Sequence, residues 1–537
     1  MSKFDYIIVG AGSAGCVLAN RLSENPANKV LLLEAGGPDT KFEIKLPGAY
    51  SKLHRSEVDW AFWSEPQEQL DGRRLFLPRG KTLGGSSSTN AMAYVRGNKA
   101  DYDEWASLGN IGWDYESVLP YFKKSEYNED IHTHFHGTNG LLNVRFAKGF
   151  KTPFATAFVK ACAENGIPTN PDYNGESQEG ASPFQFTIKN GLRHSTASAF
   201  LKPILKRPNL TIQTNAQVSK ILLEHDRAIG IEVLRKNDAV DQIFVNKEII
   251  LSAGAFQSPQ ILMLSGIGEK DELQKLGIQI KIDLPGVGKN LQDHLFFNCA
   301  ALSKTQDGFN HHIPIIPQLK GLIQLLFTQK GALTCSPLEA VAFYNSRGES
   351  GVDFQFHFAP MQVGSDYKND FHDLSTFPTV DGFSILPSLI KPKSRGYVTL
   401  RSTDPKAAPL IQPNFLTEKE DWETLIRGTR KAIELLQSSA FEPYRKTIIT
   451  PPDQSDEGII DHIKKSVETI YHPVGTCKMG SDEFAVVNDR LQVYGIKNLR
   501  VADASIMPTI VSGNTNAACI MIGEKAADLI LVGEVKR

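Results

Sequence analysis

The stretch DYIIVGAGSAG, residues 5–15, decides the fold class, because it joins an apolar strand to a helix through a glycine-rich turn. Residues 5–9 form a short apolar run, and residues 13–23 carry apolar side chains at helical spacing. A second apolar run at residues 30–33 ends at Glu34. Strand, turn, helix and strand make a βαβ unit, which requires a parallel sheet. We therefore predict an α/β fold with a Rossmann-like nucleotide-binding domain.

The turn itself matches the pattern GxGxxG, with glycines at Gly10, Gly12 and Gly15. Such glycines let the backbone approach a pyrophosphate, and the helix that follows offers free N–H groups to the anion. Glu34 lies 19 residues after Gly15, where a carboxylate can accept hydrogen bonds from ribose hydroxyls. We predict that a dinucleotide binds here through Gly10, Gly12, Ser13, Ala14, Gly15 and Glu34; the alternative is an ordinary glycine turn.

The carboxylate narrows the choice of dinucleotide. Glu34 would repel the extra phosphate of NADP, so the turn favours NAD or FAD and leaves these two open.

Composition and charge exclude several classes of protein. The chain has 537 residues, of which 41% are hydrophobic and 22% charged, values typical of a globular protein rather than a disordered or fibrous one. Lys and Arg number 58 against 60 Asp and Glu, so no basic field favours nucleic acid. The six cysteines form no CxxC pair and no metal-ligand spacing. With no signal-peptide pattern and no apolar stretch long enough to span a bilayer, we predict a reduced, cytoplasmic protein without a metal.

Four further segments carry a family resemblance. Residues 79–90 (RGKTLGGSSSTN) resemble the first signature of the glucose-methanol-choline (GMC) flavin oxidoreductases, and residues 254–268 (GAFQSPQILMLSGIG) resemble the second. Residues 472–480 (HPVGTCKMG) and 501–505 (VADAS) are also similar to this family. The resemblance covers essentially the whole chain, and the first signature is similar to that of the choline dehydrogenase and long-chain alcohol dehydrogenase branch.

The resemblance implies that the dinucleotide is FAD. Some family members link the flavin to a histidine, and Thr89 stands at that position here, so we expect FAD to be bound non-covalently. Beyond the glycine turn and Glu34, the resemblance places FAD contacts at Ala35, Arg79, Gly84, Gly85, Ser86, Asn90, Ala91, Val218, Ala253, Asp503, Ala504, Thr515 and Asn516.

The resemblance also implies a catalytic pair. His472 would face the flavin from the substrate side and accept the hydroxyl proton while hydride leaves the alcohol carbon for flavin N5; imidazole suits this role because its unperturbed pKa is near neutral. The second partner would be Asn514, which can donate a hydrogen bond to the substrate oxygen. Asn514 is also well placed to cap the last helix, and both roles can coexist.

The expected substrate is a primary alcohol with an apolar or aromatic tail. Choline-oxidising relatives carry a glutamate where this chain has Phe296, and Ile470 and Tyr471 would also line the pocket. The product would be the aldehyde, and a quinone, a dye or oxygen would take the electrons. The alternative is a lyase or a light-driven decarboxylase on the same fold. The sequence leaves the oligomeric state open.

We expect two domains, as the GMC fold implies. Residues 1–155, 200–305 and 470–537 should form the FAD-binding domain, because every flavin motif lies there. Residues 156–199 and 306–469 should form an α+β substrate-binding domain of a sheet with helices behind it.

One apolar segment has two readings. Residues 313–327 are rich in aliphatic side chains. We favour the interpretation that they form a buried helix of the substrate domain. The alternative is a lid or a peripheral contact with the inner face of a membrane, which would suit a quinone oxidant.

Overall fold

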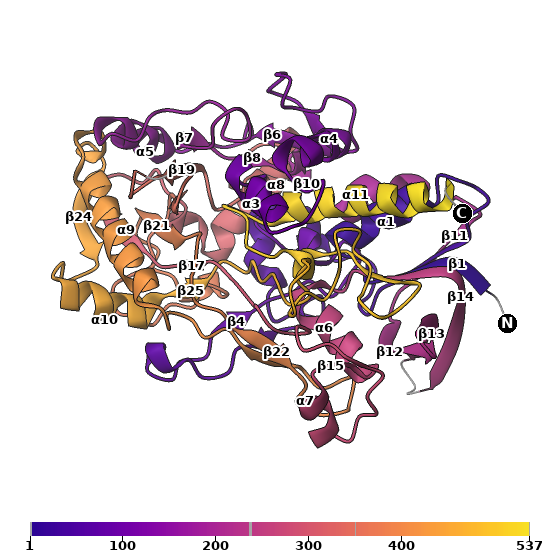
Figure 1. Cartoon of the computed structure of the whole chain (residues 1–537). Coiled ribbons are helices and arrows are strands. Elements are labelled where there is room, and N and C mark those ends of the chain that lie inside the picture. Colours follow the sequence, from indigo (N-terminus) through magenta and orange to yellow (C-terminus); the bar gives the residue numbers. More distant parts are fainter. Residues whose placement is uncertain (1–2, 236–238, 349–350, 536–537) are drawn as a thin grey trace.

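The computed structural model describes residues 3–235, 239–348 and 351–535, and its first sheet confirms the predicted βαβ unit. Strand β1 pairs in parallel with β2 and with β14, and β2 pairs in parallel with β11 (Figure 1). The sheet order is β11-β2-β1-β14-β13-β12, with β26 also on β14. The bounds are β1 Lys3–Val9, β2 Val30–Leu33, β11 Leu210–Gln213, β12 Gln217–Glu224, β13 Arg227–Leu234, β14 Val240–Leu251 and β26 Leu499–Val501.

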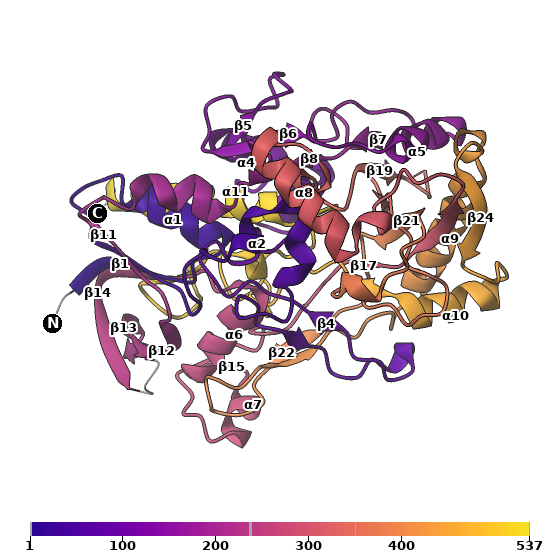
Figure 2. The ribbon, with the colours of Figure 1, turned by 180° about the vertical axis from the view of Figure 1, so that it is seen from behind.

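Two helices lie side by side against this sheet. Helices α1 (Ser13–Leu22) and α11 (Asn516–Val535) come from opposite ends of the sequence and run next to each other in both views (Figures 1 and 2). Their apolar side chains join the strands in one buried cluster. Because the N-termini of α1 and α11 meet, segments about 500 residues apart in the sequence reach one site. Other helices of this half are α3 Lys99–Ser107, α4 Tyr115–Ser125, α6 Gly254–Leu264 and α7 Lys270–Lys275.

A second sheet forms the other half of the molecule. Its order is β24-β18-β21-β20-β19-β7, with β17 on β21 and β25 on β17. The strands are β7 Gly180–Pro183, β17 Leu295–Phe296, β18 Cys299–Ser303, β19 Ala340–Tyr344, β20 Phe354–Ala359, β21 Gly382–Leu389, β24 Arg445–Thr450 and β25 Glu468–Thr469. The helices of this half are α5 Pro153–Glu164, α9 Lys419–Gln437 and α10 Asp456–Ser466.

Alternation along β20 gives the second sheet two different faces. Phe354, Phe356 and Phe358 point into an apolar cluster shared with α9, whereas the alternate residues His357 and Ala359 line a cavity. Successive side chains of a strand point to opposite faces, so one strand serves both the core and the cavity.

The strand pairing differs from the predicted domain boundary at one place. Strands β17 and β18 lie inside the predicted segment 200–305, yet they pair with the second sheet. This pairing favours a boundary before Leu295, and the division into two domains remains our proposal.

The segment 313–327 forms a helix, α8 (Ile315–Thr328), but the favoured reading of it as a buried helix is wrong. Of its residues only Leu325 is buried, and several large apolar side chains face solvent. The aliphatic content of the segment suggested a helix but did not indicate which of its faces would be buried. Within the described ranges, no helix combines the length and apolar character needed to cross a membrane.

Short elements connect these layers. They are α2 Phe42–Lys45, β3 Phe62–Trp63, β4 Phe76–Leu77, β5 Glu126–Asn128, β6 Leu142–Phe146, β8 Gln185–Phe186, β9 Ile188–Lys189, β10 Leu192–Arg193, β15 Ile267–Gly268, β16 Ile282–Asp283, β22 Tyr397–Thr399 and β23 Leu410–Gln412.

Candidate active site

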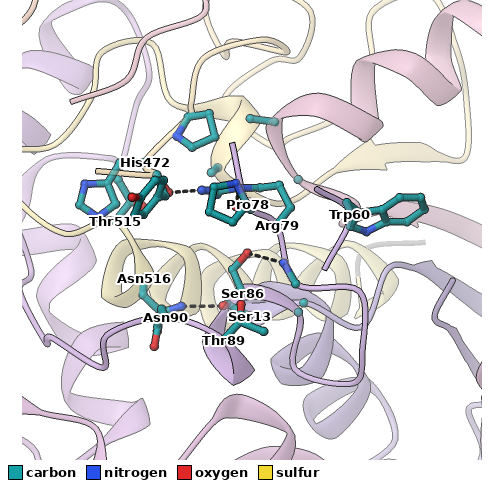
Figure 3. Close-up of a pocket in the computed structure, with 18 of the residues that line it drawn as sticks. Ser13, Trp60, Pro78, Arg79, Ser86, Thr89, Asn90, His472, Thr515 and Asn516 are labelled. Carbon is teal, nitrogen blue, oxygen red and sulfur yellow. Dashed lines mark hydrogen bonds between the residues drawn. The ribbon is translucent and has the colours of Figure 1, made fainter. Parts of the chain in front are cut away.

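One cavity collects almost all of the predicted site residues (Figure 3). It is lined by the glycine turn after β1, by residues 78–93, by the second sheet and by residues 470–473 and 514–516. Of the predicted site residues, Gly15 and Gly84 are the two that do not line it. Both glycines pack against neighbouring residues behind the cavity wall.

The glycines of the two motifs let the backbone pack without side chains. A Cβ on Gly15 would lie 2.0 Å from the carbonyl oxygen of Gly10. Gly85 has a φ of +50°, and a Cβ there would lie 2.8 Å from the Cα of Gly12. A larger residue at Gly15 would distort the glycine turn itself, and one at Gly85 would push the 79–90 segment away from that turn. The glycines therefore bring both motifs to one wall of the cavity.

Two helix N-termini face the same end of the cavity. Helix α1 starts after Gly12, which has no side chain to cap its first N–H groups. The amide of Asn516, at the start of α11, donates to the Ser13 hydroxyl over 2.7 Å, the lower dashed line in Figure 3. Both helix dipoles thus direct positive potential to this end, which suits a pyrophosphate.

The carboxylate of Glu34 lies beside this anion site. Its oxygens accept the backbone N–H groups of Ala11 at 3.0 Å and Gly36 at 2.8 Å. Burial raises the pKa of Glu34 to about 7, against the two N–H donors, which lower it. Each carboxylate oxygen keeps a further lone pair for a ribose hydroxyl. The uncapped helix, the close glycine packing and this acceptor fit the dinucleotide that the sequence predicts.

His472 stands at the other end of the cavity, on a tightly held loop. Its backbone N–H donates to the Asp293 carboxylate over 2.7 Å, and the preceding Tyr471 has a φ of +65°, which is rare for a residue with a side chain. Arg79 donates a hydrogen bond to the Tyr471 carbonyl. Burial raises the pKa of Asp293 to about 6. Helix α10 ends at Ser466, and this leaves the following residues free to form the loop.

A chain of hydrogen bonds fixes the tautomer of His472. The Nε2–H of His294 donates to the carbonyl of Ile390 over 3.1 Å, so its Nδ1 has a free lone pair. That lone pair accepts the Nδ1–H of His472, with 3.0 Å between the two nitrogens. On the far side, the amide oxygen of Asn514 accepts from Gln355 at 3.1 Å. The Asn514 amide N–H therefore donates to Nε2 of His472 over 3.3 Å.

This arrangement leaves His472 as a neutral base with its lone pair on Nε2. Burial lowers its pKa well below 6.5, and the neighbouring His294 and His357 lower it further. Burial likewise lowers the pKa of both neighbours to about 3. His472 is therefore neutral at pH 7, and the donor Asn514 and the acceptor Nε2 lie side by side.

The wall near His472 is apolar. Phe296 packs edge-on against Phe371, with 5.4 Å between ring centroids, and Ile470 and Tyr471 complete the predicted part of this wall. Among the described residues that line the cavity, the carboxylates are Glu34 and Asp503. Glu34 lies at the glycine end, and Asp503 is engaged by Ser258 and Gly254. The His472 end therefore offers no counter-charge for a cationic substrate.

Several lining residues were missed from the sequence. Tyr50, His54 and Trp60 come from the irregular stretch before the first signature, and their positions follow no spacing rule. His357 had a usable signal, because FQFHFA at residues 354–359 alternates like a half-buried strand.

Comparison with protein families gives two matches. Residues 4–296 match the N-terminal GMC oxidoreductase model, and residues 392–523 match the C-terminal GMC oxidoreductase model. Among curated proteins, the chain is 44% identical to an alcohol dehydrogenase (acceptor) of Pseudomonas putida, covering 98% of this chain and 96% of the relative. It is 43% identical to an oxygen-dependent choline dehydrogenase of Sinorhizobium fredii, covering 98% and 95%. Among solved structures, pyridoxine 4-oxidase from Mesorbium loti superimposes with a TM-score of 0.89 at 31% identity, covering 98% and 99%.

Proposed function

The chain belongs to the GMC oxidoreductase family, and from this premise we propose that it oxidises a primary alcohol with an apolar or aromatic tail to the aldehyde. It is an FAD-dependent enzyme, as the family is. When bound, FAD supplies the acceptor for the hydride that leaves the alcohol carbon. The lyase and decarboxylase alternatives draw no support from the relatives it matches.

The pairing of His472 with Asn514 carries the proposal. In the free site the amide N–H of Asn514 occupies the Nε2 lone pair of His472. A substrate hydroxyl that enters donates its O–H to this lone pair instead, and its oxygen accepts from the Asn514 amide. The proton then moves to Nε2 of His472, while Asn514 stabilises the negative charge that develops on the oxygen.

The walls of the cavity support the choice of substrate class. Phe296, Phe371 and Ile470 offer an apolar surface at the His472 end, and no carboxylate of the described lining lies there. A quaternary ammonium would lose its hydration without a counter-charge. We therefore expect aromatic or medium-chain primary alcohols to be oxidised with a higher kcat/KM than choline, although the chain resembles choline dehydrogenases.

Cofactor binding is proposed to be non-covalent, because the threonine side chain of Thr89 cannot form a histidyl link. The pyrophosphate would bind at the α1 N-terminus and the adenosine ribose at Glu34. The reducing equivalents would pass to a quinone or a dye-type acceptor or to oxygen.

Anaerobic stopped-flow reduction of the flavin by an alcohol tests this function. We expect His472→Ala to keep its FAD and to slow flavin reduction about 10²- to 10⁴-fold, the usual weight of a general base. The Ile111→Ala variant, changed at an exposed site, serves as the matched control. An unchanged rate in His472→Ala would refute the mechanism, and absence of bleaching by every alcohol in the wild type would refute the oxidation.

A further inference from the structure

Helix α8 (Ile315–Thr328) presents its more apolar face to solvent. It lies on the face of the molecule that Figure 2 turns toward the viewer. Phe327 is 85% exposed, Leu326 67% and Ile315 64%. Spacings of one, three and four residues place the exposed side chains within one stripe of the helix. The stripe consists of Ile315, Ile316, Leu319, Ile323, Leu326 and Phe327.

The side of α8 that faces the protein carries fewer apolar residues than the exposed side. Leu325 packs into a small cluster with Leu46 and Ala49, joined by Leu322 and Leu333. A helix at a protein surface normally directs its broad apolar stripe to the core and its polar side to water. Helix α8 exposes its broad apolar stripe as well as Lys320 and Gln324, and an exposed apolar patch of this kind marks an interaction surface.

The formal charges within residues 308–338 are positive, and the Asp381 carboxylate from another segment is bound to His311 before the helix. Lys320 lies within the helix and Lys330 follows it, and residues 308–338 contain no Asp or Glu. Lys52, from a neighbouring segment, reaches the helix and donates to the side chain of Gln318 over 2.7 Å. An apolar stripe flanked by lysines complements the headgroups and acyl chains of an anionic lipid surface.

The ends of α8 connect to the apolar wall of the cavity. Ile313, before the helix, and Ala332, after it, pack against the cluster that contains Met361 and Phe377. Met361, Phe377 and Leu338 also line the cavity, and Phe377 packs edge-on against Phe371, which in turn contacts Phe296. A surface that binds α8 would therefore lie near the apolar side of the candidate active site.

The size of the stripe argues against a second copy of the chain as its partner. A helix of 14 residues is about 21 Å long and about 10 Å wide. The face is thus roughly 200 Å², well below the ~800 Å² that each subunit of a stable dimer usually buries. An apolar helix face of this size is sufficient for an amphipathic helix to bind at the surface of a bilayer.

We propose that α8 docks the enzyme on an anionic lipid bilayer, with the stripe inserted at the level of the headgroups. The helix lies in the plane of the surface. Apolar substrates or acceptors dissolved in the lipid then reach the cavity without crossing bulk water.

Vesicle flotation of the FAD-loaded enzyme tests the docking. The wild type should float with vesicles of phosphatidylglycerol and phosphatidylethanolamine, and more weakly with phosphatidylcholine alone. The double variant Ile323→Gln/Phe327→Gln should lose affinity at least about 10-fold, because two apolar side chains leave the interface. Lys320→Gln/Lys330→Gln should lose roughly 30-fold on the anionic vesicles, and raising the ionic strength should weaken the wild type.

The matched control is Ile111→Gln, which removes an equally exposed side chain (82%) outside α8 and should float like the wild type. Each variant should keep its flavin absorbance, which shows that it is folded. Docking is refuted if the wild type stays unbound, or if the Ile323→Gln/Phe327→Gln variant floats like the wild type. It is also refuted if light scattering shows a dimer that this variant dissociates. Flotation needs no alcohol, so its failure is distinguishable from a failure of the proposed oxidation.

Discussion

Replacing His294 by leucine should slow the chemical step without removing FAD, because His294 sets the tautomer of His472. In the structure the Nδ1–H of His472 donates to Nδ1 of His294 over 3.0 Å. His294→Leu leaves that N–H buried without an acceptor, at a cost of about 1–3 kcal/mol. That cost shifts the tautomer equilibrium toward the form with its N–H on Nε2, although the Asn514 amide N–H, which donates to Nε2, still favours a lone pair there.

That free-energy difference sets the size of the effect. Because only the tautomer with a lone pair on Nε2 can accept the proton, flavin reduction should slow measurably, by up to about 150-fold if the whole cost appears in the tautomer equilibrium. His294→Asn is the matched control, since an amide oxygen can take the place of the Nδ1 acceptor and should restore much of the rate. The assay is anaerobic stopped-flow reduction at saturating alcohol, with the FAD content of each variant measured.

Two results would refute the reasoning. His294→Leu could reduce its flavin at the wild-type rate, which would mean that the hydrogen bond to His294 does not select the tautomer. Equal losses in His294→Leu and His294→Asn would assign His294 a packing role instead.

Further predictions concern pH, the second site residue and the cofactor. Burial lowers the pKa of His472 well below 6.5, so the neutral base persists on acidification. The rate of flavin reduction should therefore stay constant from pH 8 to pH 6.5 and fall only below pH 6.5. A midpoint of the pH profile at or above 6.5 would contradict the assignment of His472 as the base. In stopped-flow experiments, Asn514→Ala should slow flavin reduction about 10²- to 10³-fold, as expected for the loss of one hydrogen-bond donor, while the FAD content stays unchanged. Flavin reduction at the wild-type rate would exclude Asn514 as a donor to the substrate oxygen. Acid precipitation should release the yellow cofactor into the supernatant, and colour retained in the pellet would show a covalent link despite Thr89.

The sequence determined the parts of this protein that depend on local pattern. An apolar run, a glycine turn and a helix in residues 5–15 predict the βαβ unit, because each feature acts within a few residues. His472 was indicated as the candidate base by the resemblance of residues 472–480 to the GMC family and not by a physical pattern. The aliphatic content of residues 313–327 also suggested a helix, and helix α8 (Ile315–Thr328) forms there.

Tertiary structure decided what depends on contacts between distant segments. The tautomer of His472 follows from His294, Ile390, Asn514 and Gln355, which come from separate strands and loops. A sequence lists hydrogen-bonding groups without stating which partners they meet. Periodicity likewise shows which residues of α8 share a face, but only packing against Leu46 and Ala49 decides that the broad apolar face points outward. Burial changes the pKa of His472 for the same reason, because desolvation arises from everything that surrounds the ring.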